Sequence, residues 1–199
     1  VMDVYWGNPD ATAHAFADDP EGGGRWLRTG DAGHLDADGF LLVTDRIKDI
    51  IVTSGGKNIA PQPIESMLLA DPLFEQAVLL GDNRPFLTLL VKPSLPQLGA
   101  IAERLQEPYE QLADLLTNPR IVAEIIRRAR GLTQKLPSHE QFKDLRVLLE
   151  EFTPDNGLLT PTLKVRRREV ERRFAHLVDE MYARVEQMRS GLRADEVPA

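Results

Sequence analysis

Two short apolar runs near the middle of the chain constrain its fold more than any other feature. Residues 77–80 and 86–91 are mostly apolar, and residues 81–85 between them read Gly-Asp-Asn-Arg-Pro, which is typical of a turn. Short apolar runs on either side of a turn indicate two paired strands. Because helical patterns lie on both sides of this pair, we predict a small α+β core.

Helical patterns surround the strand pair. Pro61 and Pro63 stand before an apolar series that suits an amphipathic helix with proline in its first turn. Residues 93–144 also have helical spacing, and we predict that they form a helical insertion. Its clearest helix has Asn118 as the N-cap and Pro119 as the first helical residue.

The C-terminal part continues the same alternation of elements. Residues 145–149 are a further strand candidate, and a turn-rich segment follows them. Apolar residues then recur with helical spacing from Val170 to Met188. That spacing predicts one last helix whose apolar side faces the core.

The first part of the chain differs in character from the rest. Turn residues interrupt residues 1–44, so we predict loops with one short helix over residues 11–17 and little core. Asp38-Gly39 lies between two apolar stretches, which is a β-hairpin signal. A charged stretch begins after residue 44, and we place a domain boundary there, which makes residues 45–199 a second domain.

The composition excludes several classes of function. The net charge is -7 and the pI is about 5.2, whereas nucleic-acid binding needs a basic surface. The absence of cysteine excludes disulfides, thiolate metal sites and cysteine nucleophiles, and fits a cytoplasmic location. The histidines lack ligand spacing, so no metal site is predicted. No apolar run reaches the roughly 18 to 20 residues of a membrane span, and the chain start lacks a signal peptide, so we expect a piece of a longer protein.

The first candidate site is Thr29-Gly30-Asp31. The glycine permits a close backbone approach, and the Asp31 carboxylate can accept hydrogen bonds from two hydroxyl groups, as a ribose diol requires. This motif is weak when taken alone. A turn aspartate that caps its own backbone is the simpler alternative.

The second candidate site spans residues 45–59, where a charged stretch leads into a strand and then into Gly55-Gly56. Glycines let backbone amides approach a phosphate or a slender ligand. A nucleotide P-loop is excluded, because Ile51 and Asn58 stand where it requires glycine and Ser or Thr. The remaining interpretations are a structural turn and a loop that lines a ligand.

The third candidate site spans residues 156–168, a flexible loop that carries Lys164 just before a basic helix. A lysine ammonium there can neutralise charge on a phosphoryl oxygen and hold an attacking carboxylate beside it. A solvated basic cluster is the structural alternative. A nucleic-acid patch is disfavoured by the acidic chain and the lack of interleaved aromatic residues. Glu65, near the second site, is expected to be structural.

Together and in this order, the three motifs resemble the later core motifs of the acyl-adenylate-forming superfamily, which includes acyl-CoA synthetases, adenylation domains of peptide synthetases and firefly luciferase. The resemblance covers essentially the whole chain, although Val4 stands where glycine is usual. It implies an α+β fold with a small mixed or antiparallel sheet flanked by helices. This is the mobile C-terminal lid domain of these enzymes, preceded by a loop and hairpin tail of the large N-terminal domain.

The resemblance also implies a role for each matching residue. Asp31 and Arg46 would bind ATP or AMP, and Lys48 would be the hinge about which the lid rotates. Lys164 would be the catalytic lysine, which bridges the fatty carboxylate and the α-phosphate during adenylation. The loop that lines the CoA tunnel would consist of Ser54, Gly55, Gly56 and Lys57.

The helical insertion and residues 159–164 resemble the bacterial long-chain fatty-acid branch of the superfamily. The full enzyme would therefore be a long-chain fatty-acid CoA ligase that uses ATP, CoA and Mg²⁺. The magnesium ligand and the phosphate loop would lie upstream of Val1, so the chain alone should be inactive. Its partners would be these substrates and its own N-terminal domain, in the cytoplasm or at the inner membrane face.

Three alternatives stay open. A fatty-acyl-AMP ligase would pass the acyl group to a carrier protein instead of CoA. A non-catalytic interaction module could keep the lid fold and use the apolar stripe over residues 170–188 to bind a partner helix. A basic membrane-surface helix over residues 164–173 is the third, although Glu169 and Glu171 dilute its charge.

Overall fold

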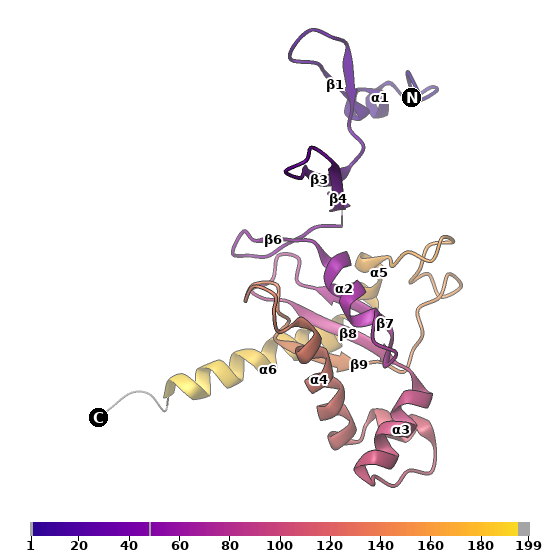
Figure 1. Ribbon diagram of the computed structural model, residues 1–199, viewed down its shortest axis with the longest axis vertical. Coiled ribbons are helices and arrows are strands. Elements are labelled where there is room, and N and C mark those ends of the chain that lie inside the picture. Colours follow the sequence, from indigo (N-terminus) through magenta and orange to yellow (C-terminus); the bar gives the residue numbers. More distant parts are fainter. Residues whose placement is uncertain (1, 48, 195–199) are drawn as a thin grey trace. The chain divides into compact units, whose positions relative to one another are not determined.

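The computed structural model describes residues 2–47 and 49–194, which divide into two compact units (Figure 1). Unit 1 is Val1–Ile50 and unit 2 is Ile51–Ala199. The domain assignment 1–44 and 45–199 stays a prediction.

Unit 1 consists of short elements with no buried core. They are α1 (Pro9–Ala15), β1 (Phe16–Asp18), β2 (Arg25–Leu27), β3 (Asp31–Leu35) and β4 (Leu41–Arg46). Strands β1 and β2 pair antiparallel, as do β3 and β4, so the predicted hairpin at Asp38-Gly39 is confirmed. A short helix is present as predicted, but it lies two residues earlier than the predicted 11–17, because residues 16–18 form β1. Its N-cap is Asn8, whose side chain accepts a hydrogen bond from the Ala11 amide. None of the unit 1 residues with described burial is buried.

Unit 2 is built on a mixed three-stranded sheet. Its strands are β7 (Phe74–Leu80), β8 (Thr88–Pro93) and β9 (Asp144–Val147), in the order β7-β8-β9. Strand β7 is antiparallel to β8, and β9 is parallel to β8. A separate antiparallel pair, β5 (Ile51–Val52) and β6 (Asn58–Ile59), precedes this sheet in the chain. The predicted strand pair and the predicted mixed sheet are therefore confirmed.

Helices cover both faces of this sheet. They are α2 (Pro61–Leu69), α3 (Leu95–Leu105), the 3-10 helix η1 (Leu112–Leu116), α4 (Pro119–Thr133), α5 (Arg167–Arg173) and α6 (Ala175–Ala194). Side chains alternate along β7, so Ala77 and Leu79 join a core with α2, α3, η1 and α4. Val78 and Leu80 join a second core with α5 and α6. The unit is a three-layer α+β arrangement, as the resemblance implied.

The last helix differs from the prediction in two ways. The predicted single helix is two helices, because Phe174 leaves the helical backbone region with φ -104° and ψ 23°. The Phe174 ring packs near the Phe152 ring, with 6.1 Å between their centroids. Met188 was expected in the core but is exposed, since α6 extends past the sheet (Figure 1). Among the described residues, no helix combines the length and the apolar content needed to cross a membrane.

Candidate functional site

Asp31 and Arg46, both predicted to contact a nucleotide, lie opposite each other in unit 1. They are register partners in the β3–β4 hairpin, and Arg46 Nε lies 3.3 Å from Asp31 Oδ1. The Asp31 amide donates to Thr29 Oγ1 at 3.1 Å, which fixes the start of β3. The hairpin register therefore brings an acceptor carboxylate and a guanidinium to one place.

The Asp31–Arg46 ion pair contributes little to the stability of the fold. The side chains are 33% exposed for Asp31 and 62% exposed for Arg46, and ion pairs at such sites contribute at most about 1 kcal/mol. The carboxylate can accept hydrogen bonds from hydroxyl groups, and the guanidinium can donate to phosphate or carboxylate oxygens. The pair could therefore bind a ligand that has a sugar hydroxyl beside an anionic group.

The second predicted site is the loop between β5 and β6, residues 53–57, and it is a tight turn. The Thr53 amide donates to the Lys57 carbonyl at 3.0 Å, and the Lys57 amide donates to Thr53 Oγ1 at 3.2 Å. The Gly56 amide donates to the Thr53 carbonyl at 2.8 Å, and Gly56 has φ +72°. A left-handed residue at that position suits glycine, because it has no Cβ.

Gly55 in the same loop is not required by local packing. A Cβ added there would meet only Thr53 Oγ1, at 4.0 Å. The loop is hydrogen-bonded to the turn at 81–84, because the Ser54 amide donates to the Arg84 carbonyl at 2.9 Å. The free space over Gly55 therefore leaves room for a slender ligand.

The third predicted site, the loop that precedes α5, contains many internal hydrogen bonds, although the sequence suggested a flexible loop. The Asn156 side chain accepts from the Thr153 amide at 3.0 Å and donates to the Glu151 carbonyl at 2.8 Å. The Thr160 amide donates to the Lys164 carbonyl at 2.8 Å, and the Lys164 amide donates to Thr160 Oγ1 at 3.0 Å. These bonds fix the backbone from which Lys164 extends.

The Lys164 side chain is exposed, and its ammonium forms no ion pair with any residue that the structure describes. Neighbouring cations behave differently, because Arg167 and Arg172 pair with Glu65 and Glu169 respectively. The basic cluster is therefore not uniformly solvated. Among the described residues of this cluster, Lys164 and Arg168 are exposed cations without an ion pair, so both stay available for an anionic ligand.

Sequence reasoning did not find the partner of Glu65. Its carboxylate accepts from Arg167 Nη1 at 2.6 Å and from the Leu79 amide at 2.7 Å, and Glu65 is buried. The only signal for this contact in the sequence was an acidic residue in the first turns of an apolar helix. That signal gives no indication of a partner 102 positions away.

The structure brings some predicted residues together and leaves others apart. Asp31 and Arg46 pair within unit 1, whereas the β5–β6 loop and the loop before α5 project from opposite sides of unit 2 (Figure 1). Lys48, the predicted hinge, lies outside the described residues. Among the described residues, no group of three or more His, Cys, Asp or Glu side chains could hold a metal ion.

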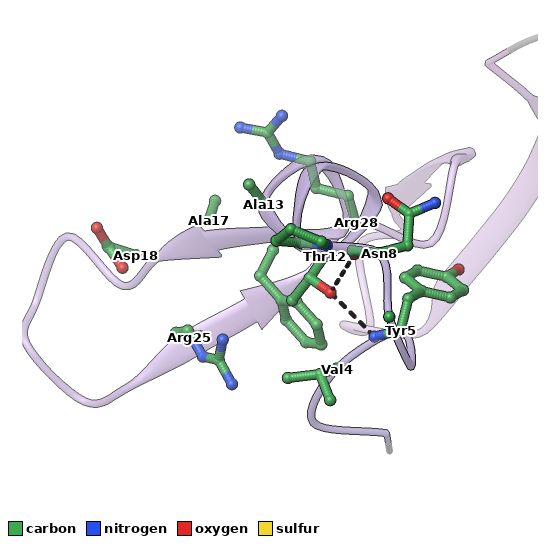
Figure 2. Close-up of a pocket in the computed structure, with 12 residues that line it drawn as sticks. Val4, Tyr5, Asn8, Thr12, Ala13, Ala17, Asp18, Arg25 and Arg28 are labelled. Carbon is green, nitrogen blue, oxygen red and sulfur yellow. Dashed lines mark hydrogen bonds between the residues drawn. The ribbon is translucent and has the colours of Figure 1, made fainter.

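A pocket of about 790 Å³ lies in unit 1 and is lined by residues between Val4 and Arg28. Figure 2 shows Thr12 at its centre, where Thr12 Oγ1 donates to the Asn8 carbonyl and accepts from the Tyr5 amide, both at 2.9 Å. Neither Asp31 nor Arg46 lines this pocket. We assign no role to it.

The family model described as AMP-binding enzyme C-terminal domain matches residues 48–186. The chain belongs to the AMP-binding enzyme C-terminal domain family. The matched segment of this AMP-binding enzyme C-terminal domain contains both lysine-bearing loops and the Glu65–Arg167 pair, whereas Asp31 and Arg46 precede it.

Curated relatives of this AMP-binding enzyme C-terminal domain chain are fatty-acid CoA ligases by name. Long-chain-fatty-acid–CoA ligase FadD15 of Mycobacterium tuberculosis is 39% identical over 183 residues, which covers 92% of this chain and 30% of that protein. Long-chain-fatty-acid–CoA ligase ACSBG1 of Homo sapiens is 32% identical over 198 residues, which covers 89% of this chain and 26% of that protein. The chain thus spans less than a third of the length of either relative.

Solved structures agree with the fold of the family. The adenylation domain of a carboxylic acid reductase from Segniliparus rugosus, in complex with AMP and a co-purified carboxylic acid, matches with a TM-score of 0.67 and 25% identity. That match covers 93% of this chain and 27% of that one. The corresponding domain from Mycobacterium chelonae matches with a TM-score of 0.66 and 24% identity, over 90% of this chain and 26% of that one. The α+β fold is that of the C-terminal portion of adenylate-forming enzymes.

Proposed function

We propose that this chain is the C-terminal part of an AMP-forming long-chain fatty-acid CoA ligase. The observation that carries the proposal is the Lys164 ammonium, which is exposed on a hydrogen-bonded turn and has no ion pair with a described residue. Lys164 lies in the segment that matches the family model, and a curated relative that matches 92% of this chain is named a long-chain fatty-acid CoA ligase. The chain alone should not turn over, because it spans only about 30% of such an enzyme.

In the first half-reaction a fatty carboxylate oxygen attacks the α-phosphorus of ATP, and pyrophosphate leaves with the electron pair of the broken P–O bond. Lys164 would lie between the carboxylate and the α-phosphate and neutralise the charge that develops there. Asp31 would accept hydrogen bonds from the ribose hydroxyls, and Arg46 would donate to the nucleotide. The 3.3 Å separation of Arg46 Nε and Asp31 Oδ1 supports a joint role at one nucleotide.

In the second half-reaction the CoA thiol gives its proton to solvent and its sulfur attacks the acyl carbon. The bond from that carbon to the phosphate oxygen breaks, and AMP leaves with the electron pair. The loop of Ser54, Gly55, Gly56 and Lys57 would line the passage for the pantetheine arm. The space over Gly55 supports this role, since a Cβ there would meet only one atom, at 4.0 Å. A slender chain could therefore pass close to the backbone.

The two half-reactions would use opposite sides of unit 2 in turn. The loop before α5 and the β5–β6 loop project from different sides, so one active site cannot be lined by both at once (Figure 1). Rotation of the domain would present each loop when its step occurs. Lys48 is the proposed hinge, and the division between the two compact units falls shortly after it.

The proposal assigns no step to a metal ligand in this chain. Mg²⁺, which would neutralise the phosphates of ATP, would be held by residues of the N-terminal portion. Contact with an anionic membrane surface is a secondary proposal. Ion pairs of Arg167, Arg172 and Arg173 with carboxylates reduce the free positive charge available for it.

The experiment that tests the function uses the full-length enzyme with acids from acetate to palmitate. ATP–pyrophosphate exchange should peak with long-chain acids, and acyl transfer should require CoA. Transfer to a phosphopantetheinylated carrier protein without CoA would instead favour a fatty-acyl-AMP ligase. Exchange that is absent with every acid would favour the interaction module that keeps the lid fold.

A further inference from the structure

The two lysine-bearing loops of unit 2 contain the same five-residue turn, although their sequences differ. One runs from Thr53 to Lys57 and the other from Thr160 to Lys164. In each, the threonine amide donates to the lysine carbonyl, at 3.0 Å in the first turn and 2.8 Å in the second. The lysine amide donates back to the threonine Oγ1, at 3.2 Å and 3.0 Å respectively.

The residue before each lysine completes the match. The Gly56 amide donates to the Thr53 carbonyl at 2.8 Å, and the Leu163 amide donates to the Thr160 carbonyl at 2.9 Å. Gly56 has φ +72° and Leu163 has φ +59°. A left-handed leucine costs roughly 1–2 kcal/mol. This strain is retained at a turn whose next residue is the proposed catalytic lysine, which is where such strain tends to have a function.

Both threonine hydroxyls are held in place by their surroundings. Thr53 is buried, and the next residue is hydrogen-bonded to the turn at 81–84. Thr160 is half-buried, and its Oγ1 lies 3.0 Å from Thr162 Oγ1. Each hydroxyl is therefore fixed before any ligand arrives, whereas the lysine side chains that follow are exposed.

We propose that Thr53 and Thr160 are positioning residues for the two half-reactions, and this proposal rests on the function proposed above. Each threonine binds both backbone polar groups of one lysine, so it sets the direction in which that ammonium leaves the turn. Thr160 positions Lys164 toward the α-phosphate for adenylation. Thr53 positions Lys57 toward an anionic group of CoA for thioester formation, because Lys57 is exposed and forms no ion pair with a described residue.

The test compares Thr160→Val with Thr53→Val in the full-length enzyme. Valine keeps the shape of threonine but removes the hydroxyl acceptor. Thr160→Val should lower fatty-acid-dependent ATP–pyrophosphate exchange about tenfold or more, since misplacement by 1 Å can cost roughly 10²-fold. It should leave thioester formation from supplied acyl-AMP within about twofold. Thr53→Val should give the reverse result, so each variant is the control for the other.

Serine and alanine variants separate positioning from folding. Thr160→Ser and Thr53→Ser keep the hydroxyl and should restore most of the affected step in kcat, with a melting temperature close to that of the wild type. If valine prevents folding at either position, the alanine variant replaces it in the same comparison. Failure of serine to restore the step would contradict the proposal.

Two further outcomes have distinct meanings. If the wild-type enzyme is active and each valine variant is impaired equally in both half-reactions, the threonines are general structural residues and the inference is wrong. If the wild-type enzyme shows no acid-dependent exchange at all, the proposed function fails, and the inference fails with it. The wild-type assay therefore separates the two kinds of failure.

Discussion

Arg167 forms a part-buried ion pair with Glu65, in which Nη1 lies 2.6 Å from Oε1 and Nη2 lies 3.1 Å from Oε2. Arg167 Nη1 also donates to the Leu79 carbonyl, and the Leu79 amide donates to Glu65. Glu65 lies on α2, which follows the β5–β6 loop, and Arg167 begins α5, directly after the Lys164 loop. This one pair therefore joins the two helices that follow the proposed functional loops.

Loss of this carboxylate should be costly. Glu65→Ala leaves the Leu79 amide without its acceptor and the part-buried Arg167 guanidinium without its anionic partner, although this guanidinium keeps the Leu79 carbonyl. The loss should lie near the lower end of the about 3–5 kcal/mol that is typical when one partner of a buried pair is removed. Chemical denaturation of the full chain measures the change in free energy of unfolding. The control is Glu150→Ala, because Glu150 pairs with Arg173 at an exposed site and should contribute less than about 1 kcal/mol. Equal losses in the two variants would contradict this interpretation.

Glu124 should make the stability of the helical insertion depend on pH. Hydrogen bonds from Arg127 and then Arg104, with the charges of both, lower the pKa of Glu124 from 4.5 to about 2. A carboxylate with a lowered folded-state pKa stabilises the fold above its unfolded pKa, and the contribution disappears as pH falls from about 4.5 to about 2. Glu124→Gln should thus be destabilised by up to about 1 kcal/mol at pH 7.

The measurement for Glu124 is the difference in unfolding free energy between wild type and Glu124→Gln from pH 7 to pH 2.5. The difference should shrink across the acidic range. A difference that stays constant with pH would show that the Arg127 and Arg104 contacts do not act through the charge of Glu124.

Gly55 and Gly56 should respond differently to substitution. Gly56→Ala places a Cβ on a left-handed residue and should cost roughly 1–2 kcal/mol of stability. Gly55→Leu should leave the melting temperature nearly unchanged, because the space around its Cβ is open. It should still slow thioester formation more than adenylation if pantetheine passes there. A Gly55→Leu enzyme with wild-type thioester formation would exclude the proposed CoA tunnel.

Leu163 offers a test of the strained turn. Leu163 is 70% exposed, so Leu163→Gly removes little packing and relieves the left-handed conformation. Added freedom of the unfolded chain opposes that gain, and the net change should stay within about 0.5 kcal/mol. Leu163→Val should cost more than about 1 kcal/mol, because β-branched residues tolerate positive φ poorly. The melting temperatures of the two variants measure this difference, and equal melting temperatures would contradict the strained turn.

The fold was largely predictable because its signals are local. Asn118 as N-cap and Pro119 as the first residue of α4 are confirmed, with the Asn118 side chain accepting from the Arg120 and Ile121 amides. Turn residues at 81–85 correctly separate β7 from β8. The break at Phe174 was not predictable, because the apolar period continues through it and the sequence there contains neither glycine nor proline.

For the candidate site, the sequence predicted which residues take part and their order along the chain, but not the contacts between them. The Asp31–Arg46 contact depends on hairpin register, and the Glu65–Arg167 pair joins positions far apart in the chain. No periodic pattern in the sequence indicates either contact. Thr53 and Thr160 were overlooked because a threonine four residues before a lysine is common, and only the backbone conformation reveals the turn. The assigned roles of the site residues stay predictions.

The most direct test of the account is the pair of half-reactions in the full-length enzyme with Lys164→Ala. Acid-dependent ATP–pyrophosphate exchange should fall by roughly 10² or more, as expected when one preorganised charge contact is removed. Thioester formation from supplied acyl-AMP and CoA should stay close to the wild-type rate, because Lys164 would not contact that step. An equal fall in both half-reactions, or no fall in exchange, would contradict the proposed role of Lys164.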